Sequence, residues 1–276
     1  MQIYYLNLDH RTDRRTFIER ELRMCGLEGE RVAAVVPGDL DPKLLEAQSR
    51  RPSGQALAPT ELACAMSHRK AWQRMLDRGL PHSLILEDDV RLSHLLPRFL
   101  ADVPEALGPR NIVRIETRLI RSKTGRAARR VGQIELRPLL SAHWGTGGYI
   151  ITADCARRIL DHPGFFDIAF DHLFFDPAGP LFSEVDTLQC FPALCIPGAM
   201  LADGNPEILW ESDIDLERRQ RFDNARALGP NRIRKLLREV KRLRRIVPRY
   251  YGMAAGFFSG DTSWRTAGFA GKDDTP

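Results

Sequence analysis

Three consecutive acids end an apolar run in the segment LILEDDV, residues 84–90. Glu87, Asp88 and Asp89 are side chains that tolerate burial poorly without a counter-charge, so we expect a cation beside them. Because side chains alternate along an extended chain, Glu87 and Asp89 project to one side and Asp88 to the other. Such a pair suits one hard divalent cation, Mg²⁺ or Mn²⁺, completed by water and phosphate oxygens. The simpler interpretation is a polar loop after a strand.

Strand and helix patterns alternate in the first half of the chain, around these acids. Strands are expected at 3–8, 31–36, 83–87, 111–116, 132–137 and 147–152. Helices are expected from Thr12 to Gly26, from Thr60 to Gly79, and in a short stretch through Leu160. This order predicts the α/β class, with an open, mainly parallel central sheet flanked by helices. Ligands of such sheets bind beyond the carboxyl ends of the strands, which is where the acids lie.

Composition indicates an ordinary globular protein. The 276 residues, 43% of them hydrophobic, suffice for one large domain or one domain with a small attachment. The five cysteines are scattered without a C-x-x-C pair, which favours reduced core thiols over disulfides or a zinc site. No leader pattern or long apolar run stands out, so we expect a cytoplasmic chain.

The net charge of +5 is concentrated in two basic segments. Residues 232–249 hold nine Arg or Lys and one Glu, with apolar residues at helical spacing up to Pro248. This pattern predicts a basic amphipathic helix that binds an anionic membrane surface or a polyanion, or that packs on the domain. Residues 118–130 hold six basic residues and no acid. Nucleic acid is a poor candidate partner, because the aromatic residues are mostly Phe within apolar runs.

Several motifs occur together in a characteristic order. They are IYYLNLDHRTDRR at the N-terminus, ELACAMSHRKAW at 61–72, LILEDDV at 84–90, GTGGYIIT at 145–152, FDHLFF at 170–175 and SDI at 212–214. In this combination the chain resembles glycosyltransferase family 25, which includes lipooligosaccharide galactosyltransferases of Gram-negative bacteria and collagen galactosyltransferases. The resemblance implies a GT-A type nucleotide-sugar fold, a divalent metal, a UDP-sugar donor and inversion at the anomeric carbon.

The resemblance covers about residues 1–215, so we predict a catalytic domain there. A basic helical extension is expected at 216–250 and a flexible tail at 251–276. The implied function is transfer of a sugar, galactose by default, to a hydroxyl of lipopolysaccharide, lipooligosaccharide or another surface glycan. The basic helix would hold the enzyme at the inner face of the cytoplasmic membrane. The alternatives are a metal-dependent phosphohydrolase or nuclease, and a non-catalytic polyanion-binding module.

The resemblance also implies roles for individual residues. The family's metal and donor motif matches Glu87, Asp88 and Asp89, which become metal or ribose ligands without a fixed assignment. Nucleotide recognition is expected at the first strand and turn, at Asn7, Asp9 and Arg14. Asp9 suits ribose hydroxyls or the uracil amide, or it caps the next helix together with Asp13. Donor-sugar neighbours are expected at Gly147, Gly148 and Tyr149, although the same glycines would serve a tight turn.

The catalytic base implied by this reading is Asp171, which stands among Phe residues that shield it from water. Asp171 or Asp176 could instead begin a helix, and Glu184 and Asp186 are rival bases.

Basic residues of 118–130 are candidates for contact with phosphate, namely Arg118, Arg121, Lys123 and Arg126, if that stretch folds over the site as a lid. His68 matches the family's LSH position, and we expect a satisfied core histidine unless it points at the metal. The segment NIVRIETRLIR stands where many members have an aspartate-rich strand, so the pocket wall near Glu116 and Arg118 is expected to differ.

Overall fold

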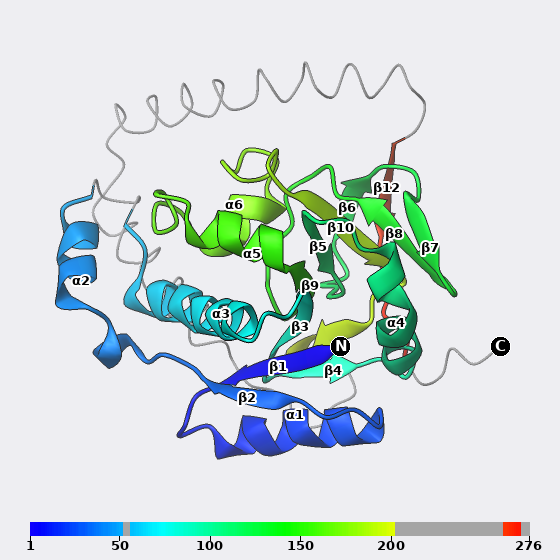
Figure 1. The fold of residues 1–276 in the computed structure, drawn as a ribbon, viewed down its shortest axis with the longest axis horizontal. Helices are drawn as coiled ribbons and strands as arrows, with labels where there is room; N and C mark the ends of the chain where they lie inside the picture. The colour runs from blue at the N-terminus through cyan, green and yellow to red at the C-terminus, as the bar shows by residue number, and fades with distance from the viewer. Residues whose placement is uncertain (52–55, 202–261, 272–276) are drawn as a thin grey trace.

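The computed structural model describes residues 1–51, 56–201 and 262–271. Its centre is an eight-stranded sheet with the order β2-β1-β3-β9-β5-β10-β8-β7 (Figure 1). The strands are β1 Gln2–Asn7, β2 Glu30–Ala33, β3 His82–Glu87, β5 Asn111–Arg114, β7 Arg129–Val131, β8 Ile134–Pro138, β9 Gly148–Thr152 and β10 Asp186–Phe191.

Six of these eight strands run in one direction. β1 is parallel to β2 and β3, and β5 is parallel to β10, whereas β9 runs antiparallel to both β3 and β5. β8 runs antiparallel to both β10 and β7. The predicted α/β architecture with an open, mainly parallel sheet is therefore confirmed.

Helices cover both faces of the sheet (Figure 1). Alternate residues of β1 show the division, since Ile3 and Tyr5 join the core on the side of α1 while Tyr4 and Leu6 join the core on the side of α3. This alternation follows from the two-residue repeat of a strand. The helices are α1 Thr12–Met24, α2 Pro42–Ser49, α3 Pro59–Asp77, α4 Leu96–Asp102, α5 Ala153–Leu160 and α6 Phe170–Phe175, with short 3-10 turns η1 Pro37–Asp39, η2 Val103–Ala106 and η3 Gly198–Met200.

Local sequence explains the bounds of α3. Pro59 occupies its first turn, where a missing N–H costs nothing, and the Glu61 carboxylate accepts a hydrogen bond from the Ala58 N–H at 2.8 Å. The helix thus begins one residue before Thr60, which we expected as its cap. It stops before Gly79, whose φ of +64° is readily adopted only by glycine, as predicted.

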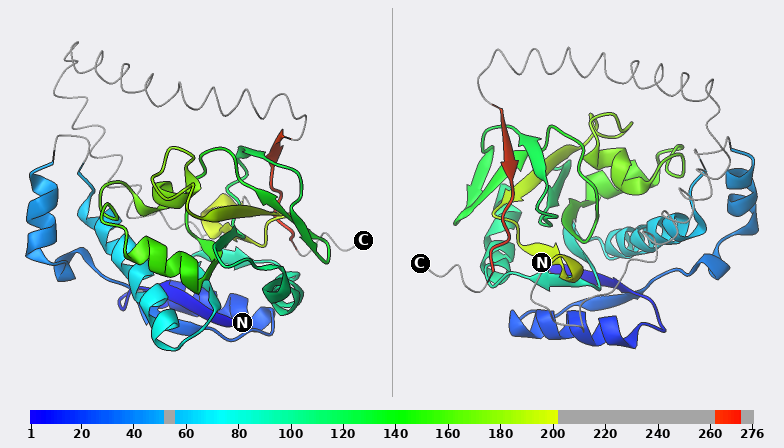
Figure 2. Two further views of the ribbon diagram at one scale, coloured as in Figure 1. Left: turned by 45° about the horizontal axis from the view of Figure 1, so that its top comes forward. Right: turned by 180° about the vertical axis from the view of Figure 1, so that it is seen from behind.

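Smaller sheets were not predicted. β4 Val90–Leu92 pairs with β11 Cys195–Pro197. Within the basic stretch 118–130, β6 Arg121–Thr124 pairs with β12 Ser263–Thr266, so this stretch contains paired strands where we expected a loop. The red strand in Figure 2 is β12, lying beside β6.

Residues 262–271 are tied to the main body beyond this pairing. The Thr117 hydroxyl donates to the Ala267 carbonyl at 2.6 Å, and the Ala193 N–H donates to the Gly268 carbonyl at 2.8 Å. Part of the segment predicted as a flexible tail is therefore ordered, because hydrogen bonds from distant residues hold it.

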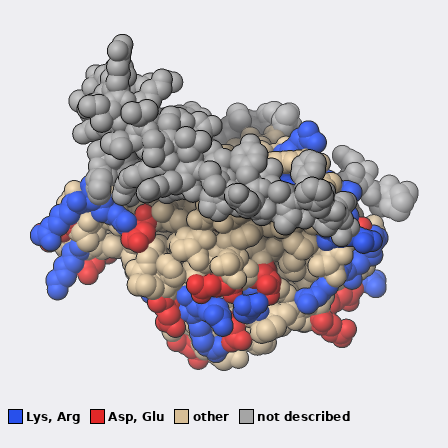
Figure 3. Space-filling view, turned by 90° about the horizontal axis from the view of Figure 1, so that it is seen from above, with Lys and Arg blue, Asp and Glu red and all other residues tan. Residues whose placement is uncertain are grey.

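The predicted basic helix at 232–249, the extension 216–250 and the SDI motif lie outside the described residues. Within the described part, none of the helices has the length and apolar character needed to cross a membrane. Acidic and basic side chains lie beside one another on the face seen in Figure 3.

Candidate active site

The candidate site lies where three parallel strands end. Asn7 and Glu87 are the last residues of β1 and β3, and Glu116 follows β5 by two residues. Because β9 runs the opposite way, its first residue, Gly148, lies at this same edge opposite Leu86 of β3. The segment 144–147, which leads into β9, is thereby placed beside the acids.

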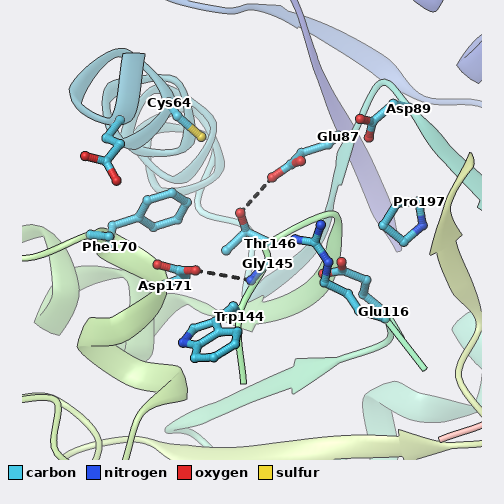
Figure 4. A pocket seen from close by; sticks show the side chains of 13 residues that line it. Cys64, Glu87, Asp89, Glu116, Trp144, Gly145, Thr146, Phe170, Asp171 and Pro197 are labelled. Atoms are coloured by element: carbon cyan, nitrogen blue, oxygen red, sulfur yellow. Dashed lines mark hydrogen bonds between the residues drawn. The ribbon is translucent and has the colours of Figure 1, made fainter. Parts of the chain in front are cut away.

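A pocket opens at this edge (Figure 4). Its lining combines carboxylates with a basic residue and aromatic side chains. The lining residues are Glu61, Cys64, Glu87, Asp89, Glu116, Arg118, Trp144, Gly145, Thr146, Ala169, Phe170, Asp171 and Pro197.

Segment 144–147 connects three of these acids. The Gly145 N–H donates to Asp171 at 3.1 Å, the Thr146 hydroxyl donates to Glu87 at 2.7 Å, and the Gly147 N–H donates to Glu116 at 3.0 Å. Gly145 has a φ of +96°, and a Cβ there would meet Glu116 at 2.8 Å, so glycine is required at this position. Each carboxylate is thus held in place by the same short segment.

The pKa values of Glu87 and Asp89 are shifted in opposite directions. Burial raises the pKa of Glu87, but the nearby His68 and the Thr146 hydrogen bond outweigh it and leave the pKa below its ordinary value. Burial, reinforced by the negative charge of Glu87, raises the pKa of Asp89 to about 7, although Arg14 opposes the shift. Negative charge therefore accumulates at the pocket, and a cation there would relieve it.

Asp88 takes no part in the pocket. Its carboxylate accepts a hydrogen bond from the Asn7 side chain at 2.7 Å and lies 3.5 Å from Arg14. Burial raises its pKa despite these two partners. Arg14 also lies 3.8 Å from Asp89, so Asn7 and Arg14 orient the acidic triplet from behind the pocket. Glu87 and Asp89 line the pocket and Asp88 does not, but Asp88 and Asp89 lie in a turn after β3 and not in the extended chain that the sequence suggested.

Asp171 lies on α6 and is 8% exposed. It shares the pocket with Phe170 and lies apart from Glu87 and Asp89 in Figure 4. Its rivals lie elsewhere: Asp186 begins β10, which is parallel to β5, so Glu184 and Asp186 precede the strand at the opposite edge of the sheet.

Other predicted site residues are placed away from the pocket. Asp9 is 80% exposed in its side chain and forms an ion pair with Arg31, which lowers the Asp9 pKa. Of the basic candidates, Arg118 lines the pocket, whereas Arg121 and Lys123 belong to β6 and do not line it.

Gly147, Gly148 and Tyr149 do not line the pocket and are packed closely against other residues. A Cβ at Gly148 would come within 2.3 Å of the Cys195 sulfur, and one at Gly147 within 2.9 Å of Val90. Tyr149 is fully buried, and its hydroxyl lies 2.7 Å from His68 Nδ1. Gly148 begins β9 and no tight turn precedes it, and His68 lies in the core.

Sequence reasoning overlooked several residues of the lining, among them Trp144, Glu61 and Cys64. Trp144 is 51% exposed beside Asp171's partner Gly145, while Glu61 and Cys64 come from α3. No local signal marked Trp144, because its exposure cannot be read from the segment HWGTGG and large aromatic side chains are usually buried.

Comparisons with known proteins agree with this architecture. The model of "Glycosyltransferase family 25 (LPS biosynthesis protein)" matches residues 1–174. Lacto-N-neotetraose biosynthesis glycosyltransferase LgtB of Neisseria meningitidis serogroup B is 31% identical, over 88% of this chain and 94% of that protein. Lipooligosaccharide biosynthesis protein lic2B of Haemophilus influenzae is 27% identical, over 79% of this chain and 83% of that protein. Procollagen galactosyltransferase 1 of Danio rerio is 27% identical, over 58% of this chain and 28% of its own length. The chain belongs to glycosyltransferase family 25 and is a glycosyltransferase, as its motifs predict.

Proposed function

We propose that this enzyme is an inverting, metal-dependent glycosyltransferase of GT-A type. It transfers a sugar, by default galactose, from a UDP-sugar to a hydroxyl of lipopolysaccharide, lipooligosaccharide or another surface glycan. The relatives named for lacto-N-neotetraose and lipooligosaccharide biosynthesis support this acceptor class. The family assignment favours a transferase over the phosphohydrolase, nuclease and polyanion-binding alternatives.

One observation carries the proposal: within a single pocket, Asp171 is separated from Glu87 and Asp89. Glu87 and Asp89 lie in one part, and Asp171 lies in another, with Gly145 and Thr146 between them (Figure 4). Inverting transfer needs this separation, because the acceptor hydroxyl must lose a proton on one face of the sugar while the diphosphate leaves from the other.

The residues present fit a hard divalent cation, Mn²⁺ or Mg²⁺. Glu87 and Asp89 offer carboxylate oxygens, and burial together with the negative charge of Glu87 raises the pKa of Asp89. When bound, such an ion neutralises charge that develops on the leaving diphosphate. Arg118, which lines the same pocket, supplies a further positive charge for a phosphate oxygen.

Asp171 is the proposed base. It accepts a hydrogen bond from the Gly145 N–H and is 8% exposed, so its orientation is fixed and water competes little for it. Its free lone pairs can accept the proton of the acceptor hydroxyl as that oxygen attacks the anomeric carbon.

Trp144 supplies an apolar surface next to this base. Its indole is half exposed, while its carbonyl accepts a hydrogen bond from buried Arg114 at 2.8 Å, so the backbone is anchored and the ring is presented to the pocket. The apolar face of an acceptor sugar would lose water by packing on the indole.

The enzyme would act in the cytoplasm, at the inner face of the membrane. This part of the proposal rests on the sequence of 232–249, whose basic residues can each gain about 1 kcal/mol near an anionic surface.

Thermal unfolding with a panel of UDP-sugars, with and without Mn²⁺, tests the proposal. A ligand at about 100 times its Kd stabilises the folded state by about 2.7 kcal/mol. We expect one UDP-sugar to raise the unfolding temperature when Mn²⁺ is present, and Asp89→Asn to lose this shift. Asp102→Asn is the matched control, because Asp102 is an exposed acid outside the pocket. If no UDP-sugar stabilises the wild type with any divalent metal, the proposed donor is wrong.

A further inference from the structure

Three side chains of metal-binding types converge at one wall of the pocket. Cys64 and His68 are four residues apart on α3 and therefore share one face of that helix, and Glu87 approaches them from the end of β3. One ligand atom from each lies within 4.8 Å of the other two. Cys64 and Glu87 also line the pocket, so this cluster is reachable from the solvent side (Figure 4).

The imidazole of His68 provides an independent observation. His68 is fully buried, and its Nε2 has no hydrogen-bond partner; Glu87 Oε1, the nearest carboxylate oxygen recorded, lies 3.6 Å away. Buried polar nitrogens without a partner are uncommon and call for an explanation such as an ion. Here the orphaned nitrogen lies on the side of the ring that faces the Glu87 carboxylate.

The ring of His68 is also held as a metal ligand's ring would be. Its Nδ1 lies 2.7 Å from the Tyr149 hydroxyl, which in turn accepts a hydrogen bond from Trp72 Nε1 at 2.8 Å. All three side chains are fully buried. Such outer partners fix the tautomer and orientation of a coordinating histidine.

We propose that Cys64, His68 and Glu87 form a binding site for a borderline-soft transition metal of the Zn²⁺ class. A thiolate with an imidazole selects Zn²⁺ or Co²⁺ over Mg²⁺ and Mn²⁺, which prefer oxygen. Three protein ligands leave a fourth position for water or a pocket ligand. This site is distinct from the hard-cation pair Glu87 and Asp89, although the two share one carboxylate.

Proton balance limits the affinity. Coordination releases the Cys64 thiol proton to solvent and uses the Nε2 lone pair of His68, whose ring proton then sits on Nδ1 and is donated to the Tyr149 oxygen. That oxygen now accepts from both His68 and Trp72, so the Tyr149 hydroxyl hydrogen has no acceptor among them. We therefore expect weaker binding than at a closed structural zinc site.

If the proposed function holds, the zinc site and the Mn²⁺ site compete for Glu87. Zinc held by Cys64, His68 and Glu87 would withdraw Glu87 from the Mn²⁺ and diphosphate site. Zinc would then inhibit transfer in competition with Mn²⁺, whereas zinc binding itself does not depend on what the enzyme transfers.

Cobalt titration of the metal-free, full-length protein tests the site. Co²⁺ bound by a thiolate gives a charge-transfer absorption band in the near ultraviolet and tetrahedral bands in the visible. We expect both in the wild type, with displacement by Zn²⁺. Cys64→Ser should abolish the thiolate band and weaken Zn²⁺ binding at least about ten-fold, given that loss of even an outer partner costs that much. The matched control is Cys25→Ser, which replaces another partly buried cysteine. This variant should keep both the thiolate band and the affinity for Zn²⁺.

Absence of a thiolate band in the wild type, or its persistence in Cys64→Ser, would overturn the proposal. Circular dichroism checks that each variant is folded, and Glu87→Gln, which removes a second ligand with little change in size, keeps the test decisive if Cys64→Ser does not fold. Stabilisation by UDP-sugars with Mn²⁺ is measured on the same samples. Cobalt binding without that stabilisation contradicts the proposed donor alone, and stabilisation without cobalt binding contradicts the zinc site alone.

Discussion

Arg114 donates a hydrogen bond to the Glu116 carboxylate at 2.9 Å, and both side chains are almost completely buried beneath the pocket. The pair also supports the site, because Arg114 donates to the Trp144 carbonyl and Glu116 accepts from the Gly147 N–H. Burial lowers the pKa of Arg114 and raises that of Glu116, while each charge counteracts the shift of the other. The two charges are tolerated because they are paired.

Breaking this pair should destabilise the protein strongly. Glu116→Leu leaves the Arg114 charge buried without its partner, and we expect the free energy of unfolding to fall by about 3–5 kcal/mol. Asp102→Asn, which breaks the exposed ion pair with Arg98, should change it by less than about 1 kcal/mol. Urea denaturation compares the three proteins. Equal effects of the two substitutions would show that the buried pair contributes no more than a surface pair.

Asp171→Asn should separate catalysis from donor binding. We expect kcat to fall by about 10²–10⁴-fold, the range associated with a general base, while the affinity for the UDP-sugar stays unchanged. Asp186→Asn, at the opposite edge of the sheet, should leave kcat near the wild-type value. Steady-state kinetics and ligand titration measure both quantities. Retained turnover in Asp171→Asn would mean that another group removes the proton.

Trp144→Ala should weaken binding of the acceptor and leave binding of the donor nearly unchanged. Loss of roughly 1 kcal/mol of apolar contact would raise the acceptor KM by about five- to ten-fold, with little change in the donor KM. Trp264→Ala is a matched control, because Trp264 is also 51% exposed but lies on β12, outside the pocket lining. Similar kinetic effects of the two substitutions would contradict a specific role for Trp144.

His143 should make the folded state sensitive to mild acid. Burial and the positive charge of Arg114 lower the His143 pKa to about 3, from an ordinary value of 6.5. Below pH 6.5 the unfolded chain binds a proton at this residue and the folded chain does not, so stability falls as pH decreases toward 3. From pH 6.5 to 5 the loss is about 2 kcal/mol from this group. Denaturation at pH 7 and pH 5 should show a smaller loss for His143→Gln than for the wild type, and an equal loss would contradict the assignment.

Local sequence was sufficient for the main elements of the fold. β1, β3, α1 and α3 follow from hydrophobic periodicity together with helix-ending glycines such as Gly26 and Gly79, because these signals act within a few residues. β6 and β12 carry no comparable pattern. Their pairing joins residues that are far apart in sequence, such as Lys123 with Trp264, and short polar strands give no periodic signal.

The sequence predicted the types of residue in the site better than it predicted where each side chain lies. The acids of LILEDDV were identified from sequence, but Asp88 is held away from the pocket by Asn7 and Arg14, and those contacts arise only from the arrangement of β1, α1 and β3. Trp144 and Cys64 were missed for a related reason. A single exposed aromatic side chain, or one cysteine on an apolar helix, has no spacing that distinguishes it from ordinary surface or core residues.

The pairing of β12 with β6 means that the folded unit is discontinuous in sequence. Within residues 262–271, Ala267 and Ala270 are buried, and the Ala267 carbonyl accepts a hydrogen bond from the Thr117 hydroxyl. This segment therefore packs as part of the main body. Ending the polypeptide near residue 215 would therefore leave β6 as an unprotected edge, a known starting point for aggregation. A minimal enzyme therefore has to keep residues 262–271.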